Sequence, residues 1–523
     1  MNNSRHAYDA VVIGSGFGGS INALRLAEAG KSVLVLERGR RYKSGEFPRN
    51  VSDVTNLFWR YPKQAEFRGL YEMDFFSGIA TVVASGVGGG SLIYANIHIR
   101  PDEVVFEHPR WPRSINRKSL DPYYDKVAEM LGIAPVPADI SLPKRDVFRQ
   151  AAQKLNREVF DPDQAVSWKE PGGPGREACR MATECEFGCN YGAKNTLDLT
   201  YLAKAEQLGA HVQTGIYVTH IGPLQNGYRV FYKDIETGEA GSIDATRTVV
   251  SAGTLGTNRV LFRSRDIFKT LPNLSAKLGW GFSGNGDFLG SIQNSNFDLE
   301  PWNGPDVTSV IRYFDKQPEF TMAAPSFSKP VMEVLASLGQ PNHGWLRFLS
   351  PLLWRRMVPI LIWAFKKGMF SKPSKASMHN AGEPARMTNL FAIGRDNANG
   401  QIRLKRGNLD IKWKYARENR KLVKRMTAGM QEITDIYGGT FAPLFSWNIF
   451  KRIITVHPLG GCNLSDSPKD GVVSCEGEVH GYPGLYVADG SVIPSSIGFH
   501  PCMTISAISE QTAQAVVKSY ERL

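Results

Sequence analysis

Three glycines and one acid near the start of the chain have the types and the spacing needed to bind a dinucleotide. Gly14, Gly16 and Gly19 form a GxGxxG motif directly after an apolar run, and a second apolar run ends on Glu37. Glycines at this spacing let the chain turn tightly, let the backbone approach a pyrophosphate and let the next helix pack on the strand. The carboxylate of Glu37 can accept hydrogen bonds from a ribose diol, and its charge disfavours a 2′-phosphate. The motif therefore predicts a site for FAD or NAD.

The elements that must position this motif follow from the pattern around it. Residues 9–13 and 33–37 are each typical of a buried parallel strand, and residues 20–30 predict a helix that Gly30 ends. Free N–H groups at the start of this helix would face the phosphates. Farther along, a second helix is followed by a β run that reaches Val218 and then by an antiparallel hairpin. This order indicates a doubly wound α/β sheet.

Length, charge and cysteine content set limits on the class of protein. A chain of 523 residues exceeds what one core usually holds, so we expect two structural lobes. The net charge is +12, but the sequence has no zinc finger, basic helix or RNA-binding aromatic motif, so we expect no nucleic-acid partner. The first strand starts too close to residue 1 for a signal peptide, and six cysteines suit reduced thiols. We therefore expect a cytoplasmic protein.

A second glycine block and three C-terminal phrases add to the first motif. Residues 85–96 read SGVGGGSLIYAN, and the phrases VHPLGGC, LYVADGS and GFHPCMT begin at Val456, Leu485 and Gly498. Glycines packed this densely let the main chain lie against a flat or phosphorylated ligand. With the N-terminal motif, these stretches resemble the glucose-methanol-choline oxidoreductases, particularly their cholesterol-oxidase-like branch. The resemblance spans nearly the whole chain and implies an FAD-dependent enzyme that oxidises alcohols.

The resemblance also implies the fold and the division of the chain. We expect an α/β fold in which a Rossmann-type FAD-binding domain is interleaved with an α+β substrate domain built on an antiparallel sheet. The FAD-binding domain would be discontinuous, made of residues 1–40, 85–135, 200–290 and 455–523. The substrate domain would be made of residues 41–84, 136–199 and 291–454.

Residues that match the family's motifs are implied to hold the cofactor. Val218 would touch adenine, and Asp489 would bond the ribityl or pyrophosphate region. N–H groups at the start of the last helix could hold the pyrimidine oxygen of the flavin when it becomes anionic. An asparagine of the family falls here on Ala95, with the amide one residue later. The full implied set is Gly14, Ser15, Gly16, Phe17, Gly18, Gly19, Glu37, Arg38, Gly89, Gly90, Ser91, Asn96, Val218, Ala252, Gly253, Asp489, Gly490, Pro501, Cys502 and Met503.

Two histidines carry the implied chemistry. Oxidation of an alcohol removes a hydroxyl proton together with a hydride, and a neutral imidazole is suited to accept the proton. His457 and His500 both precede proline, and they match the two active-site positions of the family. In cholesterol-oxidase-like relatives the second position is usually asparagine. A flavin N5 would take the hydride. The predicted substrate is an apolar alcohol, sterol-like or long-chain, and the acceptor of the electrons is oxygen or another molecule.

Other functions would use parts of the same pattern. A pyridine-nucleotide dehydrogenase would explain the first motif but neither the second glycine block nor the C-terminal phrases. A light-driven fatty-acid decarboxylase of the same superfamily would not need His457 and His500. A flavin-binding protein that only relays electrons would need neither of them.

Cys179, Cys185 and Cys189 lie close together in sequence, just before the phrase Gly-Ala-Lys-Asn-Thr. A zinc or iron–sulfur site needs four thiolates or a histidine partner, and the fourth ligand is absent nearby. The sequence therefore predicts no bound metal.

An apolar stretch with flanking cations lies at residues 346–370. Its uninterrupted apolar part, residues 357–365, is far shorter than the ~20 residues that span a bilayer. Two interpretations stay open: a buried helix of the substrate lobe, or an amphipathic segment that contacts a membrane peripherally, at its inner surface.

Overall fold

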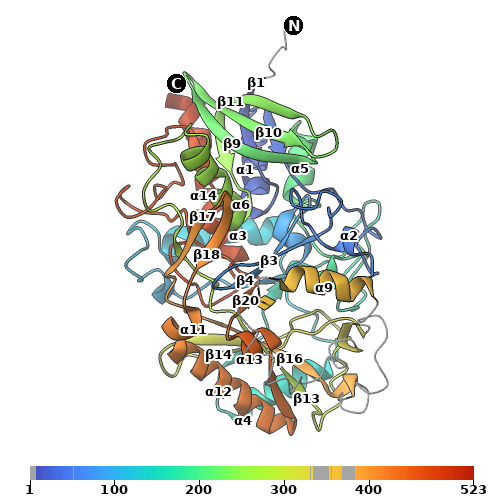
Figure 1. Cartoon of the computed structure of the whole chain (residues 1–523). Helices are drawn as coiled ribbons and strands as arrows, with labels where there is room; N and C mark the ends of the chain where they lie inside the picture. The colour runs from blue at the N-terminus through green and yellow to red at the C-terminus, as the bar shows by residue number, and fades with distance from the viewer. Residues whose placement is uncertain are drawn as a thin grey trace.

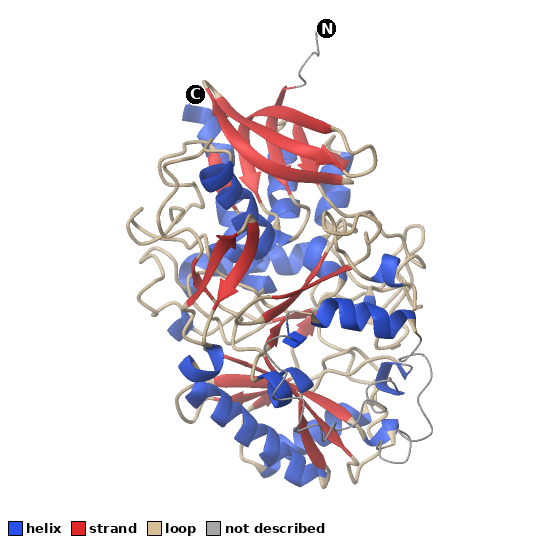
Figure 2. Cartoon of the chain, viewed as in Figure 1, coloured by secondary structure: helices blue, strands red, loops and turns tan. Residues whose placement is uncertain are grey.

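The computed structural model describes residues 7–50, 52–329, 331–333, 353–354, 356–367 and 383–522. Two larger sheets lie at opposite ends of the molecule in Figures 1 and 2, and smaller sheets lie between them. The first sheet carries the glycine motif, and the second is antiparallel. The predicted α/β fold with a Rossmann-type domain and an antiparallel second sheet is confirmed.

The first sheet has the strand order β8-β2-β1-β11-β10-β9, with β21 beside β11. Both neighbours of β1 run parallel to it, and β10 and β11 form the predicted antiparallel hairpin. Strand β9 also pairs antiparallel with β10. Residues 10–13 of β1 and all four residues of β2 are buried, as expected for strands covered on both faces. The strands are β1 (Ala7–Ile13), β2 (Val33–Leu36), β8 (His211–Gln213), β9 (Ile216–Leu224), β10 (Gly227–Asp234), β11 (Ala240–Val250) and β21 (Leu485–Val487).

Helix α1 follows β1 and begins earlier than the sequence predicted. It spans Phe17–Glu28, so Gly18 and Gly19 belong to its first turn rather than to the preceding turn. A Cβ on Gly18 would lie 1.3 Å from the carbonyl oxygen of Ala488, and one on Gly19 would lie 1.9 Å from that of Gly14. These two glycines therefore allow the helix to pack directly on the backbone around it.

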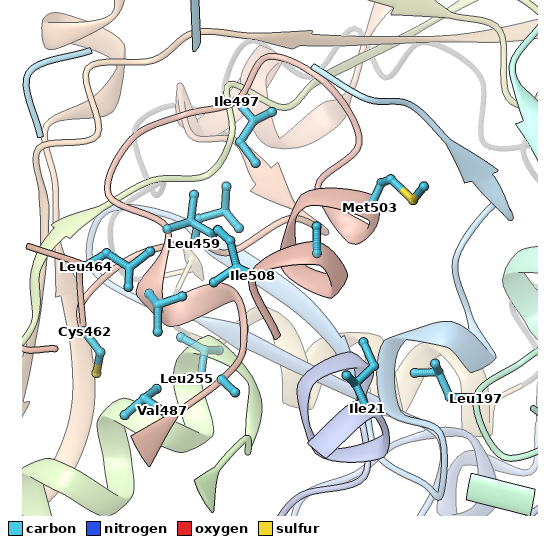
Figure 3. Packing of buried hydrophobic residues seen from close by; sticks show 14 of the residues in the cluster. Ile21, Leu197, Leu255, Leu459, Cys462, Leu464, Val487, Ile497, Met503 and Ile508 are labelled. Carbon is cyan, nitrogen blue, oxygen red and sulfur yellow. The ribbon is translucent and has the colours of Figure 1, made fainter. Parts of the chain in front are cut away.

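The two ends of the chain meet around this sheet. Helix α14, near the C-terminus, packs against α1 and α3. Figure 3 shows Ile21, Leu255, Val487 and Ile508 in the same buried cluster, although they come from distant parts of the sequence. The helices here are α3 (Arg117–Leu131), α5 (Tyr201–Gln207), α6 (Gly253–Phe262) and α14 (Cys502–Lys518).

The second large sheet has the strand order β19-β13-β16-β15-β14-β6 and is antiparallel throughout. Helix α12 packs on β13, β16 and β19, and α4 packs on α12. The strands are β6 (Val159–Phe160), β13 (Phe288–Gln293), β14 (Val310–Tyr313), β15 (Phe320–Ala323), β16 (Thr388–Gly394) and β19 (Thr440–Pro443). The helices are α4 (Pro143–Lys154), α11 (Tyr415–Glu418), α12 (Arg420–Tyr437) and α13 (Phe445–Phe450).

Smaller elements join the two large sheets. Their sheets have the orders β20-β4-β3, β12-β17-β18 and β5-β7. The predicted boundary at residue 290 falls inside β13, which pairs only with second-sheet strands, so this segment of the second sheet begins at Phe288. The elements are β3 (Tyr71–Phe75), β4 (Ala80–Ala84), β5 (Ile97–His98), β7 (Asp163–Gln164), β12 (Trp280–Phe282), β17 (Gly400–Lys405), β18 (Asn408–Lys412), β20 (Ile454–Thr455), α2 (Val54–Leu57) and α9 (Met357–Lys366).

Candidate active site

A cavity of about 350 Å³ extends from the glycine motif of the first sheet to the two predicted histidines. Its wall combines β1 and the start of α1 with β4, the start of α6 and the C-terminal phrases. Sixteen predicted cofactor residues lie on this wall: Gly14, Ser15, Gly16, Phe17, Gly18, Glu37, Arg38, Gly89, Gly90, Val218, Ala252, Gly253, Asp489, Gly490, Pro501 and Cys502. Segments far apart in sequence therefore form one continuous site.

At the nucleotide end, the carboxylate of Glu37 is held by the glycine turn. Ser15 donates to Oε2 from its backbone N–H (3.1 Å) and from its hydroxyl (2.6 Å), and the N–H of Gly39 donates to Oε1 (2.8 Å). These three bonds fix the carboxylate at the cavity wall. A ribose hydroxyl can use the lone pairs that they leave free.

The space beside the glycines fits a cofactor that approaches the backbone closely. A Cβ on Gly16 would come no nearer than 3.9 Å to other protein atoms, and one on Gly90 no nearer than 3.7 Å. The protein itself does not fill these positions, so an alanine would project into open space beside the cavity. Buried His500 adds a polar atom, Nδ1, that has no hydrogen-bond partner in the described part of the chain. The site therefore fits an extended ligand with a phosphate-rich part and a polar ring.

Four predicted cofactor residues lie behind the wall rather than on it. Gly19 supports the packing of α1, and Met503 is buried. The hydroxyl of Ser91 donates to Gly88 O (2.8 Å) and accepts from Leu197 N (3.1 Å), so it shapes the second glycine block. Asn96 is fully buried, and its amide has no partner among the described residues. Their contact with a cofactor stays a prediction.

At the other end of the cavity, His457 and His500 face each other. Their ring centroids lie 5.3 Å apart and their planes are nearly perpendicular, at 84°. The ring of Phe391 stacks on His457 at 5.7 Å and meets His500 edge-on at 6.1 Å. All three rings line the cavity. The structure thus brings together the two predicted histidines, which are 43 residues apart in sequence, from 457 to 500.

A buried carboxylate holds one of these imidazoles. Nδ1 of His457 lies 2.8 Å from Oδ1 of Asp287, which is fully buried and directly precedes β13. No hydrogen bond to Nε2 of His457 occurs among the described residues, and the ring lines the cavity. Burial, together with the nearby His457 and His98, holds the pKa of His500 well below its usual range, so His500 is neutral.

His98 lies behind this wall. Its Nε2 is 3.2 Å from the hydroxyl of Tyr94, and its Nδ1 is 3.9 Å from Sγ of Cys502. Burial lowers the pKa of His98 to about 3, so it is neutral. Tyr94 and Cys502 line the cavity, whereas His98 does not, and it supports both from behind.

Sequence reasoning missed Asp287, Phe391 and Glu186. Burial, and then the carboxylate of Asp306, raise the pKa of Glu186 to about 8, which leaves a protonated carboxyl on the cavity wall. Its backbone is anchored because its N–H donates to Asp306 (2.8 Å) and its carbonyl accepts from Tyr71 (2.6 Å). None of the three lies in a recognisable motif, so only their position in the fold reveals them.

The three clustered cysteines are free thiols, as are the other three. Burial raises the pKa of Cys179 to about 11 and holds that of Cys185 well above its usual range, so both are protonated. Within the described ranges, no three His, Cys, Asp or Glu side chains are arranged to hold a metal ion. Lys194 instead binds this loop, because its ammonium donates to Cys185 O (2.7 Å).

Comparison with known proteins identifies the family. Family models described as GMC oxidoreductase match residues 8–265 and 396–509. The chain belongs to the GMC oxidoreductase family. The expected glucose-methanol-choline resemblance is thereby confirmed, and so is the prediction that the chain is an oxidoreductase. In this family member, the matched segments contain the glycine motif, both histidines and the Asp-Gly-Ser phrase.

Relatives of this GMC oxidoreductase cover almost its whole length. A cholesterol oxidase of Acinetobacter baumannii is 28% identical over 98% of this chain and 94% of its own length. A long-chain-alcohol oxidase of Arabidopsis thaliana is 24% identical over 98% of this chain and 68% of its own. The crystal structure of pyridoxine 4-oxidase from Mesorbium loti has a TM-score of 0.64 at 16% identity, covering 97% of this chain and 98% of the other. The last comparison supports the fold alone.

Proposed function

We propose that this protein is an FAD-dependent oxidoreductase that oxidises the CH–OH group of an apolar alcohol, sterol-like or long-chain. One observation carries the proposal: the two imidazoles, whose ring centroids are 5.3 Å apart, line the same cavity as the GxGxxG motif. The similarity to a cholesterol oxidase and to a long-chain-alcohol oxidase supports an alcohol as the substrate.

The residues of the cavity have separate roles in binding the cofactor and in moving the proton of the substrate. Backbone of the two glycine blocks, Glu37 and Asp489 would hold FAD along the wall. When bound, FAD supplies a hydride acceptor at N5 of the flavin. Nε2 of His457 would accept the proton of the substrate hydroxyl, and neutral His500 would hydrogen-bond the same oxygen and orient it.

The apolar part of the wall supports an apolar substrate. Val82, Val83, Ile93 and Phe391 line the cavity, and so does Val456, which is 47% exposed. Burying these side chains against a hydrocarbon gains about 25 cal/mol per Å². A sterol or a long-chain alcohol can cover such a surface, whereas a small polar alcohol cannot.

Anaerobic reduction of the purified holoprotein tests this function. We expect the flavin absorbance to bleach on mixing with at least one member of a panel of sterols, fatty alcohols and aryl alcohols. Admission of air then distinguishes the acceptors, because an oxidase regains its colour rapidly with formation of hydrogen peroxide. A protein that purifies without flavin and takes up none, or that no alcohol reduces, would contradict the proposal.

We also propose that α9 contacts an anionic membrane surface peripherally and admits substrate from lipid. Val358 and Ile362 are buried in a cluster with Val54, Phe58 and Phe67, while Ile360 and Trp363 are exposed. Among the described residues of this segment, Arg356, Lys366 and Lys367 are exposed. A tryptophan flanked by cations is typical of a membrane interface. In the described ranges, no helix is both long and apolar enough to cross a bilayer, and residues 346–352, 355 and 368–370 lie outside those ranges.

Flotation with vesicles of anionic lipid tests this contact. We expect Trp363→Ala combined with Arg356→Glu to lose most of the binding, because an apolar anchor and a charge attracted to the lipid are both removed. Trp280→Ala is the matched control, since Trp280 is similarly exposed but lies on β12. Equal flotation of all three proteins would rule out α9 as the contact.

A further inference from the structure

Asp287 connects the second large sheet to the histidine end of the cavity. It precedes β13 directly and is fully buried. Its Oδ2 accepts from the N–H of Val456 (2.9 Å) and lies 2.8 Å from the hydroxyl of Thr455, while its Oδ1 faces Nδ1 of His457. Among the described residues, His457 is the only ion-pair partner of this carboxylate.

The two oxygens of Asp287 are therefore not equivalent. A backbone N–H can only donate, so the bond from Val456 fixes Oδ2 as an acceptor. The same segment fixes the imidazole, since the N–H of His457 donates to the hydroxyl of Thr455 at 2.9 Å. The carboxylate and the ring are thus both held by residues 455–457, and the contact between Oδ1 and Nδ1 has a single geometry.

We propose that Asp287 is a positioning residue that holds His457 in the tautomer with its proton on Nδ1, which leaves the lone pair of Nε2 facing the cavity. A carboxylate oxygen accepts, so Nδ1 must donate to it. When Nε2 takes a proton, the ring becomes an imidazolium beside a buried anion that has no other charged partner in the described structure. The carboxylate therefore stabilises the charge that appears during proton transfer. This inference rests on the proposed role of His457 as the base.

The variant Asp287→Asn turns this arrangement into a test. Because the N–H of Val456 requires an acceptor, the amide oxygen must take the place of Oδ2. The amide NH₂ then faces Nδ1, which must accept, so the proton of the ring moves to Nε2. Nε2 can no longer act as a base. The substitution keeps the shape of the side chain and reverses the tautomer.

Two measurements on the holoprotein report the tautomer. Diethyl pyrocarbonate modifies an unprotonated imidazole nitrogen, so peptide mapping should show that His457 reacts at least about tenfold more slowly in Asp287→Asn. Flavin reduction at saturating substrate should slow on the order of 10²- to 10⁴-fold, as expected when the base carries the wrong tautomer, with substrate affinity within about threefold of the wild type.

Asp396→Asn is the matched control. Asp396 is also a buried carboxylate and accepts from Ser283 Oγ and from the N–H groups of Gly284 and Gly286, so it holds the loop before Asp287. It has no hydrogen bond to His457. Its Oδ1 also accepts from the N–H of Ala398 (2.8 Å), so an amide at this position sets an NH₂ against a backbone donor and disturbs this loop without reversing the tautomer of His457. We therefore expect modification of His457 and flavin reduction much closer to the wild type than in Asp287→Asn. An equal loss in both variants would assign the effect to loop geometry and overturn the proposal.

The outcomes separate this inference from the proposed function. If His457→Ala slows reduction but Asp287→Asn changes neither rate nor modification, the positioning role is wrong and the function stands. If no alcohol reduces the wild type, the function fails, and the modification experiment alone decides the tautomer. Should Asp287→Asn not fold, the ¹⁵N spectrum of histidine-labelled wild type decides instead: we expect a protonated Nδ1 for His457, and a protonated Nε2 would overturn the proposal.

Discussion

The two ends of the cavity are built in different ways. At the nucleotide end, backbone groups approach one another so closely that Gly18 and Gly19 have no room for a side chain. At the histidine end, side chains from distant segments meet, and a buried carboxylate 170 residues away holds one of them. The first end depends on the absence of Cβ atoms, whereas the second depends on the direction of single hydrogen bonds. Changes at the first end should therefore impair binding or folding, and changes at the second should impair chemistry.

The largest expected effect compares two glycines of one motif. Gly18→Ala places a methyl group 1.3 Å from the carbonyl oxygen of Ala488, so we expect a loss of at least about 3 kcal/mol in stability and little holoprotein. Gly16→Ala meets no protein atom within 3.9 Å, so the apoprotein should fold normally but retain much less FAD. Thermal unfolding followed by circular dichroism and the flavin content per chain measure the two effects. Full flavin content in Gly16→Ala would show that the cofactor does not approach this turn.

At the histidine end, His457→Ala should separate binding from chemistry. The ring lies outside the glycine motif, so the variant should keep its FAD and its visible spectrum. Without the base, anaerobic flavin reduction by the best alcohol should be more than ~100-fold slower. Rapid-mixing absorbance measures this rate. A near-normal rate would remove His457 from the mechanism. It would also contradict the expectation that changes at the histidine end impair chemistry.

The smallest expected effect concerns Glu186. Its pKa of about 8 in the folded protein exceeds the ordinary value of 4.5, so the folded state keeps a proton that the unfolded chain has released. Stability from this group is therefore full below about pH 4.5 and is lost as the pH rises towards 8. We expect Glu186→Gln to gain stability relative to the wild type as the pH rises through this window, because glutamine has no proton to release. Denaturant unfolding at several pH values measures the free energy of unfolding of both proteins. If the two plots of this free energy against pH run parallel, the prediction is wrong.

The difference between contacts that are local in sequence and contacts between distant segments also explains which features the sequence predicts. The strand, glycine turn, helix and acid of the first motif were predicted because their contacts join residues less than about 25 positions apart, such as Ser15 and Glu37. The start of α1 was placed three residues late, since glycines usually indicate a turn and here two of them are helical. The helical glycines are explained by the backbone of Ala488, which no local pattern contains.

The sequence by itself determined the dinucleotide motif, the family and the two histidines, because each is written in a short phrase whose spacing has a physical meaning. The tertiary structure alone decided that these phrases share one cavity and that Asp287 meets His457 there. The reason is that an isolated aspartate before a strand has no distinguishing spacing, and its role arises only when the fold brings Asp287 against residues 455–457.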